Sequence, residues 1–444
     1  MQRDIYKKLI LWKNSKDRKP LLLQGARQTG KTYILKEFGK NEYEHLIYCN
    51  FEEDPGLEEF FRGNIDPHRI IEMLSLYKKQ PVRPGADLIF FDEIQLSNNA
   101  LNALKYFNEE APLYHVVAAG SLLGVKLSVP KSFPVGKVTM LTLYPMTFHE
   151  FLPAAGEARY RELLENISEI EPLPVPIHEE LITLLKKYYF VGGMPEAVAH
   201  YSRSGSLEEV RVIQDDIIKS YALDFAKHAA VSDIPKLSLI WDSIPVHLAR
   251  ENKKFIFSAI SKSARAREYE SALKWLQDAG LIHLAYAVET IQQPLNGFLD
   301  RSTFKVYAAD VGLLGAMARI QPDILTQKHD LFTTYNGAFV ENFTAQQLVA
   351  SLQPHLYYWK SESKKAEVDF LYEHSASIFP LEVKAGVNPK SKSLLSYDRH
   401  FHPKLLIRAT LLNIKLHKHI LDIPLYAINC LDKFTQQSRL KNSD

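Results

Sequence analysis

A glycine-rich segment near the start of the chain has the residue types and spacing of a phosphate-binding loop. Its pattern, G-x-x-x-x-G-K-S/T followed by an aromatic residue, is formed by Gly25, Ala26, Arg27, Gln28, Thr29, Gly30, Lys31, Thr32 and Tyr33. The glycines let several N–H groups point at phosphate oxygens, and the start of a helix adds a positive dipole. Lys31 would reach the β- and γ-phosphates, and the Thr32 hydroxyl would bind Mg²⁺. We expect all of these residues to contact a nucleotide such as ATP.

The residues around this loop predict the strand and the helix that must hold it. Residues 21–23 are apolar without alternation, which is typical of a strand buried on both faces of a parallel sheet. A helical pattern then runs from Tyr33 to Phe38 and reaches Gly39. A glycine-rich turn without a ligand is the alternative, and the order of strand, loop and helix argues against it.

A second apolar run, residues 88–91, ends in two carboxylates, Asp92 and Glu93. Open α/β sheets bind their ligands at the carboxyl ends of the strands, where these side chains would lie. Asp92 would hold Mg²⁺ through water, and Glu93 would polarise the attacking water. Such a pair alone is more often a helix cap, but the preceding loop favours the catalytic interpretation. A third predicted strand ends at Ser121, whose hydroxyl could contact the γ-phosphate or the attacking water.

The last third of the chain places a second set of charged residues on predicted strands. Asp369 falls within the second strand of a predicted hairpin, and Glu382 and Lys384 alternate on a later strand, so they share one face. An aspartate followed by Glu-x-Lys is the signature of the PD-(D/E)XK nuclease fold. Asp369 and Glu382 would bind one or two divalent metals, Mg²⁺ or Mn²⁺, and Lys384 would orient the attacking water. A Glu-x-Lys pair is common by itself, so this prediction depends on the whole set.

A glutamate on a predicted helix completes the set. Glu341 aligns with Ala345, Leu348 and Leu352 on one narrow helical face. A carboxylate within an apolar stripe is costly unless it is paired or binds a metal. The alternative is that Glu341 faces solvent and interacts with the helix dipole. Because Asp369 follows in the expected order, we predict that Glu341 joins the acidic site as a catalytic residue.

The middle of the chain predicts a winged helix-turn-helix. Residues 253–289 contain a short helix, a polar turn, a longer helix that ends at Gly280, and a strand, and residues 304–310 would return as the wing. The longer helix would enter the major groove of DNA. The residues expected to contact DNA are Lys262, Arg265, Arg267 and Lys274. A solvated charged face, or a winged helix that acts as a spacer, is the alternative.

Length and composition limit the classes of protein to consider. At 444 residues the chain exceeds what one hydrophobic core supports, so several domains are expected. No run approaches about eighteen apolar residues, and the N-terminus has no signal-peptide pattern, so we expect no membrane segment. The two cysteines, Cys49 and Cys430, form neither a disulfide framework nor a zinc site, which favours a reducing cytoplasm. The net charge of +2 neither requires nor excludes nucleic acid.

Four segments together resemble AAA-superfamily ATPases of bacteria and archaea that carry a C-terminal restriction-endonuclease-like domain. They are the phosphate-binding loop, the FFDEIQ segment, LTLYPMTFHEF at 141–151 and FVGGMPEAV at 190–198. The resemblance implies an AAA-type fold with a helical lid, in which Pro195 contacts the nucleotide. Relatives commonly have an arginine where this chain has Lys137, which lacks the planar fork suited to phosphate, so no arginine finger is assigned there.

The predicted organisation is an α/β multidomain protein. Its parts are a P-loop AAA-type ATPase core (1–152), a helical lid (153–228), a winged helix-turn-helix with linker (229–310) and a PD-(D/E)XK nuclease-like domain (311–444). We expect an ATPase that acts on DNA, either as a nuclease or as a nucleotide-dependent switch whose terminal domain binds DNA or protein without cutting. An ATPase that assists assembly without nucleic acid is the third alternative, and a homo-oligomer is compatible with each.

Overall fold

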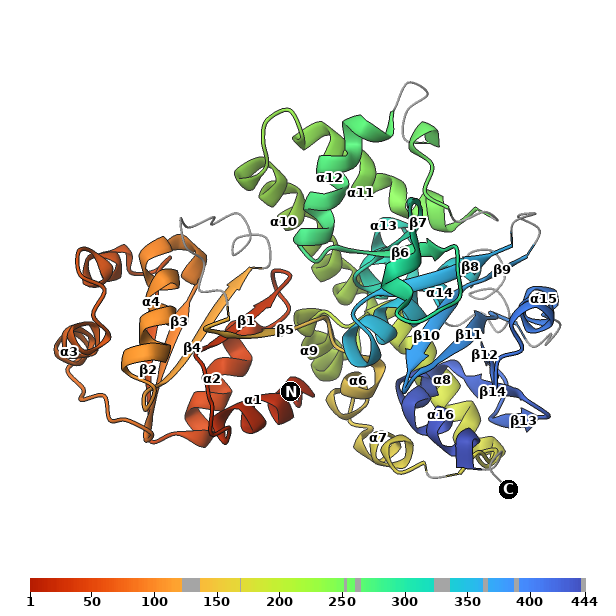
Figure 1. Cartoon of the computed structure of the whole chain (residues 1–444), viewed down its shortest axis with the longest axis horizontal. Coiled ribbons are helices and arrows are strands. Elements are labelled where there is room, and N and C mark those ends of the chain that lie inside the picture. Colours follow the sequence, from red (N-terminus) through yellow and green to blue (C-terminus); the bar gives the residue numbers. More distant parts are fainter. Residues whose placement is uncertain are drawn as a thin grey trace. The chain divides into compact units, whose positions relative to one another are not determined.

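The structure, a computed structural model, describes residues 1–121, 136–167, 169–250, 254–259, 265–322, 336–361, 366–386 and 391–440. The chain divides into two units (Figure 1). The N-terminal unit comprises Gln2–Tyr144 and Asp278–Gly280, and the C-terminal unit comprises Met1, Pro145–Gln277 and Leu281–Asp444. The sequence places the end of the ATPase core at residue 152, and this boundary stays a prediction. No helix within the described ranges is long and apolar enough to cross a membrane.

The N-terminal unit is built on a parallel sheet with the strand order β2-β3-β4-β1-β5. The strands are β1 (Leu21–Gly25), β2 (His45–Asn50), β3 (Asp87–Asp92), β4 (His115–Ser121) and β5 (Thr139–Thr142). Strand β4 lies between β1 and β3, although it follows both of them in the chain. The carboxyl ends of β1, β4 and β3 therefore meet at one edge of the sheet.

Helices cover both faces of this sheet, as its unbroken apolar strands predict. One face packs against α1 (Ile5–Lys13) and α2 (Lys31–Glu42), and the other against η1 (Pro55–Phe61), α3 (Pro67–Lys78) and α4 (Asn98–Glu110). Within β3, Leu88 and Phe90 face the first core, whereas Ile89 and Phe91 face the second. Each of these side chains is fully buried, which explains why the strand lacks a polar alternation.

Helix α2 continues past Gly39, where the sequence predicted its end. A Cβ atom at Gly39 would lie 2.7 Å from Cδ1 of Leu46, at the start of β2. The glycine therefore permits close packing between the helix and the strand and does not terminate the helix.

The C-terminal unit begins with a group of helices. They are α6 (Phe148–Ala154), α7 (Ala158–Glu165), α8 (Val175–Val191), α9 (Pro195–Ser204), α10 (Leu207–His228) and α11 (Ile234–Leu248). Helix α6 starts within the LTLYPMTFHEF segment because Thr147 and Glu150 form a reciprocal capping box.

The predicted helix-and-hairpin region has the expected order of elements, but its hairpin belongs to a larger sheet. The elements are η3 (Phe257–Ala259), α12 (Ala266–Asp278), β6 (Ile282–Val288), η4 (Leu295–Phe298), β7 (Leu299–Ala308) and α13 (Val311–Met317). Strand β6 pairs antiparallel with β7 and parallel with β8 (Leu356–Lys360), and β8 pairs antiparallel with β9 (Glu367–Val368). The strand order of this sheet is β7-β6-β8-β9. Within the described residues 254–259, the first predicted helix is represented by the 3-10 helix η3. The two strands predicted to form a wing are thus joined to strands that the sequence assigned to the terminal domain.

The terminal part adds α14 (Asn336–Gln347), which continues as a π-helix over Leu348–Leu352, and a mixed sheet. The sheet order β10-β11-β12-β14-β13 is formed by β10 (Phe370–His374), β11 (Ser377–Val383), β12 (Leu406–Thr410), β14 (Ile420–Pro424) and β13 (Lys415–His417). Helices α15 (Lys392–Phe401) and α16 (Leu431–Leu440) and the 3-10 helix η7 (Leu425–Cys430) accompany it.

The sequence predicted that Asp369 lies within a strand, and this prediction is wrong. Asp369 lies between β9 (Glu367–Val368), in the first sheet of this unit, and β10, in the second. The break has a physical reason: the Asp369 carboxylate accepts a hydrogen bond from the N–H of Val383 at 2.8 Å. The chain therefore changes from one sheet to the other at this aspartate.

Candidate nucleotide site and acidic site

The phosphate-binding loop joins β1 to α2 and depends on two residues with left-handed backbone conformation. These are Gln28, with φ of 63°, and Gly30, with φ of 91°. Helix α2 begins directly afterwards at Lys31, and the first N–H groups of a helix lack partners within the helix. A Cβ atom at Gly25 would lie 2.3 Å from the carbonyl oxygen of Leu143, so this position requires glycine. The loop has the geometry that phosphate binding needs.

Arg3 supports the loop from a part of the sequence that gave no signal. Its guanidinium is buried and donates hydrogen bonds to the carbonyl oxygens of Thr29, at 3.1 Å, and Tyr144, at 2.7 Å. Thr29 is itself fully buried and donates to the carbonyl oxygen of Ala26 at 2.9 Å. A single arginine in a charged N-terminal segment resembles many surface arginines, so the sequence could not single it out.

The Lys31 ammonium is buried among neutral partners. Only 8 % of the residue is exposed, and its described hydrogen bonds go to the carbonyl oxygens of Ala26, at 2.8 Å, and Gly25, at 3.2 Å. Burial lowers the pKa of Lys31 to about 8, although the charges of Glu93 and Asp92 act in the opposite direction. A buried cation is costly unless an opposite charge compensates it. The lysine is therefore arranged to bind an anion.

Asp92 and Glu93 lie at the carboxyl end of β3, as predicted. Asp92 is buried and accepts a hydrogen bond from the Tyr48 hydroxyl at 2.9 Å. Burial and the Asp92 charge raise the pKa of Tyr48, so this donor keeps its proton. Glu93 has φ of 51° and precedes the 3-10 helix η2 (Ile94–Leu96) without a side-chain cap hydrogen bond, so the helix-cap alternative is wrong for it. Gln95 donates to its carboxylate.

Ser121 lies at the same edge because of the strand order. Strand β4 pairs with β1 in a register that places Ser121 opposite Gly25, and with β3 in a register that places Ala118 opposite Phe91. The serine therefore lies between the strand that leads into the phosphate-binding loop and the strand that ends at Asp92. All three predicted parts of the nucleotide site meet at one sheet edge.

The acidic residues predicted in the terminal part also come together. Glu341 in α14 is only 5 % exposed, so the alternative of a solvent-facing side chain is wrong. Glu382 in β11 is buried, and its oxygens lie 2.5 Å from Nζ of Lys384 and 2.7 Å from the Ser391 hydroxyl. Burial opposes the charge of Lys384, but Glu382, Asp369 and Glu341 together raise its pKa. The four predicted residues thus share one electrostatic environment.

A lysine that the sequence did not single out lies within this environment. Lys305 in β7 is 1 % exposed, and its Nζ lies 2.6 Å from Oε1 of Glu367, 3.7 Å from Oδ1 of Asp369 and 3.8 Å from Oε2 of Glu341. Burial opposes its charge, but Tyr307 and the three carboxylates raise the pKa of Lys305 well above its usual value. The sequence feature that could have identified Lys305 is its position as a charged residue within the segment 303–308, which forms the buried end of β7.

The carboxylates differ in how well they fit a divalent metal. Within the described part of the chain no group of three or more His, Cys, Asp or Glu side chains is arranged to hold a metal ion. The carboxylates of Glu341, Glu367 and Asp369 each lie within 4 Å of the Lys305 ammonium, so a cation is already present beside them. Asp369 and Glu382 offer the oxygen ligands that Mg²⁺ or Mn²⁺ prefers.

The basic residues expected to contact DNA are exposed where the structure describes them. Arg265, Arg267 and Lys274 are exposed at and along α12, whereas Lys262 lies outside the described residues. The opposite face of α12 is buried, as its helical spacing predicted, and consists of Tyr269, Leu273 and Leu276. This amphipathic arrangement leaves the basic face accessible.

The FVGGMPEAV segment joins α8 to α9 within the C-terminal unit, and its glycines have a packing role. A Cβ atom at Gly193 would lie 2.0 Å from the carbonyl oxygen of Met146, and one at Gly192 would lie 2.2 Å from Oδ1 of Asp310. The buried Asp310 carboxylate accepts the N–H of Gly193 at 2.6 Å. Pro195 is the first residue of α9, as predicted, and its nucleotide contact stays a prediction.

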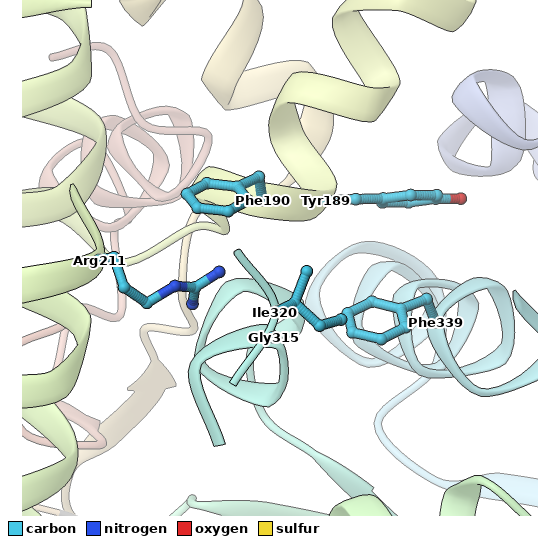
Figure 2. A pocket seen from close by; sticks show the side chains of 6 residues that line it. All are labelled: Tyr189, Phe190, Arg211, Gly315, Ile320 and Phe339. Atoms are coloured by element: carbon cyan, nitrogen blue, oxygen red, sulfur yellow. The ribbon is translucent and has the colours of Figure 1, made fainter. Parts of the chain in front are cut away.

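A small cavity beside this segment is a packing feature. Figure 2 shows its lining, formed by Tyr189, Phe190, Arg211, Gly315, Ile320 and Phe339. The Arg211 guanidinium lies 4.2 Å from the centre of the Phe190 ring and donates to Oε1 of Gln214 at 2.6 Å. The cavity measures about 10 Å³, which is room for about one water molecule. It is too small to bind a nucleotide or another metabolite.

Three protein-family models match successive parts of the chain. Residues 17–152 match an AAA domain, residues 182–324 a domain of unknown function (DUF8612), and residues 336–428 a second domain of unknown function (DUF4143). Residues 17–152 therefore resemble an AAA-type domain, and the phosphate-binding loop lies within this match. The family match and the parallel sheet agree with the predicted P-loop fold of the N-terminal part and with an α/β multidomain chain.

Solved structures give weaker similarities. The Walker-type ATPase paby2304 of Pyrococcus abyssi is 15% identical with a TM-score of 0.46, and the match covers 71% of this chain and 95% of that chain. The Thermotoga maritima RuvB Holliday junction branch migration motor is 16% identical with a TM-score of 0.27, covering 66% and 90%. Drosophila ORC bound to DNA is 16% identical with a TM-score of 0.24, covering 71% and 93%. No curated protein matches the chain. At these TM-scores the similarities carry no functional argument.

Proposed function

We propose that this chain hydrolyses Mg-ATP at the edge of the N-terminal sheet and uses the nucleotide state to control how the C-terminal unit engages DNA. The observation that carries the proposal is the buried Lys31 ammonium, which has neutral carbonyl partners inside a loop of phosphate-binding geometry. A phosphate group has the charge and the acceptor oxygens that this arrangement requires.

Each residue at the sheet edge has a separate role in the proposed reaction. Lys31 binds the β- and γ-phosphates, and Thr32 and Asp92 supply the oxygen ligands that suit Mg²⁺. The ion, when bound, offsets the charge of the phosphate oxygens. Glu93 accepts a proton from the attacking water, and Ser121 donates a hydrogen bond to the γ-phosphate or to that water. The position of Glu93 and Ser121 on adjacent strand ends supports these two roles.

Phosphate release from ATP by the full-length protein tests this part of the proposal. We expect turnover that requires Mg²⁺ and changes when double-stranded DNA is added. Absence of turnover with and without DNA would contradict ATP hydrolysis, whereas turnover that DNA leaves unchanged would contradict the coupling.

For DNA contact we propose the exposed basic face of α12. Arg265, Arg267 and Lys274 lie on accessible positions, and Lys262 is assigned to the same surface from the sequence alone. We expect Arg267→Ala to weaken DNA binding and to lower the slope of log affinity against log salt by about one. Arg301→Ala, which removes an exposed arginine from β7, is the matched control. Equal loss of affinity in both variants would contradict a specific contact by α12.

Metal-dependent DNA cutting is a second candidate for the PD-(D/E)XK-like terminal part. It is favoured by the shared environment of Asp369, Glu382, Lys384 and Glu341. Asp369 and Glu382 would hold Mg²⁺ or Mn²⁺, which polarises the scissile phosphate, while Lys384 orients the attacking water and Glu341 contributes negative charge beside it. The rival candidate is a switch whose terminal part binds DNA or protein without cutting.

Supercoiled and linear DNA distinguish these candidates. The protein is incubated with each DNA, with Mg²⁺ or Mn²⁺, and with or without ATP, beside Asp369→Asn and the exposed control Glu289→Gln. Cutting that requires metal and is lost only in Asp369→Asn supports the nuclease. ATP-sensitive binding without cutting supports the switch.

We further propose a cytoplasmic location. Cys49 and Cys430 are both buried free thiols, and burial raises the pKa of each to about 12, which agrees with a protein that needs no disulfide. Self-association stays a prediction that sedimentation with and without ATP would test.

A further inference from the structure

Lys305 is compensated by carboxylates from separate elements of the C-terminal unit. Its Nζ lies within 4 Å of Glu341 from α14, Glu367 from β9 and Asp369 from the break between the two sheets. Only 1 % of its side chain is exposed. Burying an ammonium group is costly unless opposite charge compensates it, and these three side chains supply that charge.

The position of this ammonium is determined by the sheet. Lys305 pairs with Ala285 of β6 on one side and forms a bridge with Lys254 on the other. Tyr307 lies two residues later on the same face of β7 and donates to Oε2 of Glu341 at 3.2 Å. The Lys305 ammonium also lies 4.9 Å from the centre of the Tyr358 ring. Lys305 is thus held in place as part of the acidic site, unlike a mobile surface lysine.

We propose that the Lys305 ammonium is the resident cation of the group formed by Glu341, Glu367 and Asp369 and that it excludes a divalent metal from this group. A metal ion there would place two more positive charges beside a buried ammonium group, which is electrostatically unfavourable. A divalent metal in the terminal part is then limited to the position proposed between Asp369 and Glu382, and its binding is independent of Glu341 and Glu367. The inference deepens the proposed nuclease-like site by limiting it to one metal.

The test counts the Mn²⁺ ions bound by full-length, nucleotide-free protein, using calorimetric titration together with the electron paramagnetic resonance of free Mn²⁺. Glu341→Gln and Glu367→Gln in otherwise wild-type protein should leave the number of bound ions unchanged. Lys305→Met should gain about one ion per chain, and this ion should disappear in the double variant with Glu367→Gln. Lys305→Arg should gain none, because it keeps the positive charge.

A second measurement follows the melting temperature. Saturating Mn²⁺ should raise the Tm of Lys305→Met by about 4 °C or more relative to its effect on Lys305→Arg, because the added ion binds only the folded state. Loss of a bound ion from Glu341→Gln alone would overturn the proposal, and this comparison needs no Lys305 variant to fold. A folded Lys305→Met variant that gains no ion would also overturn it. Failure of the proposed DNA activity would appear in the DNA assays alone, since neither measurement here uses DNA or ATP.

Discussion

Two buried lysines show how differently the two units treat a positive charge. Lys31 in the N-terminal unit donates to two carbonyl oxygens, and burial lowers its pKa to about 8. Lys305 in the C-terminal unit is even more deeply buried, yet nearby carboxylates raise its pKa well above the usual value. The same side chain is thus destabilised as a cation in one unit and stabilised in the other.

The difference indicates whether the charge of each lysine is compensated by a bound ligand or by side chains of the protein. The ammonium in the phosphate-binding loop becomes favourable when an anion binds beside it, so ligand binding and charge compensation are the same event. The ammonium in the acidic site is compensated by Glu341, Glu367 and Asp369 within the folded chain. Burial of a lysine alone therefore does not identify a ligand site, whereas the charge of its neighbours does.

The largest effect is expected for the catalytic step that only the N-terminal site is proposed to perform. Glu93→Gln should lower ATP turnover about 10²- to 10⁴-fold while ATP affinity stays close to wild type, because an amide cannot accept the proton of the attacking water. Phosphate release and equilibrium ATP binding measure the two quantities. Glu110→Gln, an exposed residue at the end of α4, is the control. Unchanged turnover in Glu93→Gln would refute the assignment of the base.

Replacing each of the two lysines with methionine tests whether its charge contributes to the stability of its unit. Lys305→Met should lower the free energy of unfolding of the C-terminal unit by about 3 kcal/mol, since it leaves the buried Glu341 carboxylate and the partly exposed Asp369 and Glu367 carboxylates without their partner. Lys31→Met should change that of the N-terminal unit by less than about 1 kcal/mol or increase it, because the lysine has neutral partners. Urea unfolding in the absence of nucleotide measures both. Equal losses of unfolding free energy in the two variants would contradict the proposed difference in charge compensation between the two lysines.

ATP affinity should depend on Lys31 and not on Lys305, which is the reverse of the order expected for stability. Lys31→Ala should weaken ATP binding by about 10- to 100-fold, which corresponds to the loss of charge-assisted hydrogen bonds of roughly 1.5–3 kcal/mol. Lys305→Arg should leave ATP affinity unchanged. Lys40→Ala, at an exposed position of the same helix as Lys31, controls for the loss of a positive charge. If Lys40→Ala had the same effect, long-range electrostatics would explain the loss and a direct contact would be excluded.

The smallest expected effect concerns acid stability and again separates the units. Burial lowers the pKa to about 4 for His115 in the N-terminal unit and for His247 and His283 in the C-terminal unit. A histidine in the unfolded chain has a pKa of about 6.5, so the unfolded state binds more protons, and stability falls as the pH decreases from about 6.5 to about 4. Thermal unfolding between pH 7 and pH 5 should therefore show the steeper loss for the C-terminal unit. His247→Phe should flatten that dependence, and an unchanged slope would contradict a neutral buried His247.

Local sequence patterns were enough to predict where the candidate nucleotide-site residues lie, because each part of that site is a short continuous segment. The phosphate-binding loop consists of consecutive residues, and the strands beside it are apolar on both faces because helices cover both faces of the sheet. Asp92 and Glu93 follow directly from the end of β3. The helix with Glu341 and the order of Asp369, Glu382 and Lys384 were also predictable, since their periodicity and spacing are properties of short segments.

Which distant residues meet depends on the folded arrangement of the elements and could not be predicted from the sequence. The strand order places Ser121 opposite Gly25, and no local pattern encodes the insertion of β4 between β1 and β3. The role of Lys305 depends on carboxylates from α14 and β9. In the sequence it is a charged residue within an apolar strand, and the reason for its charge is visible only once the folded unit places these carboxylates beside it. Local periodicity is set by the backbone geometry of one element, whereas charge compensation is set by neighbours that folding brings together.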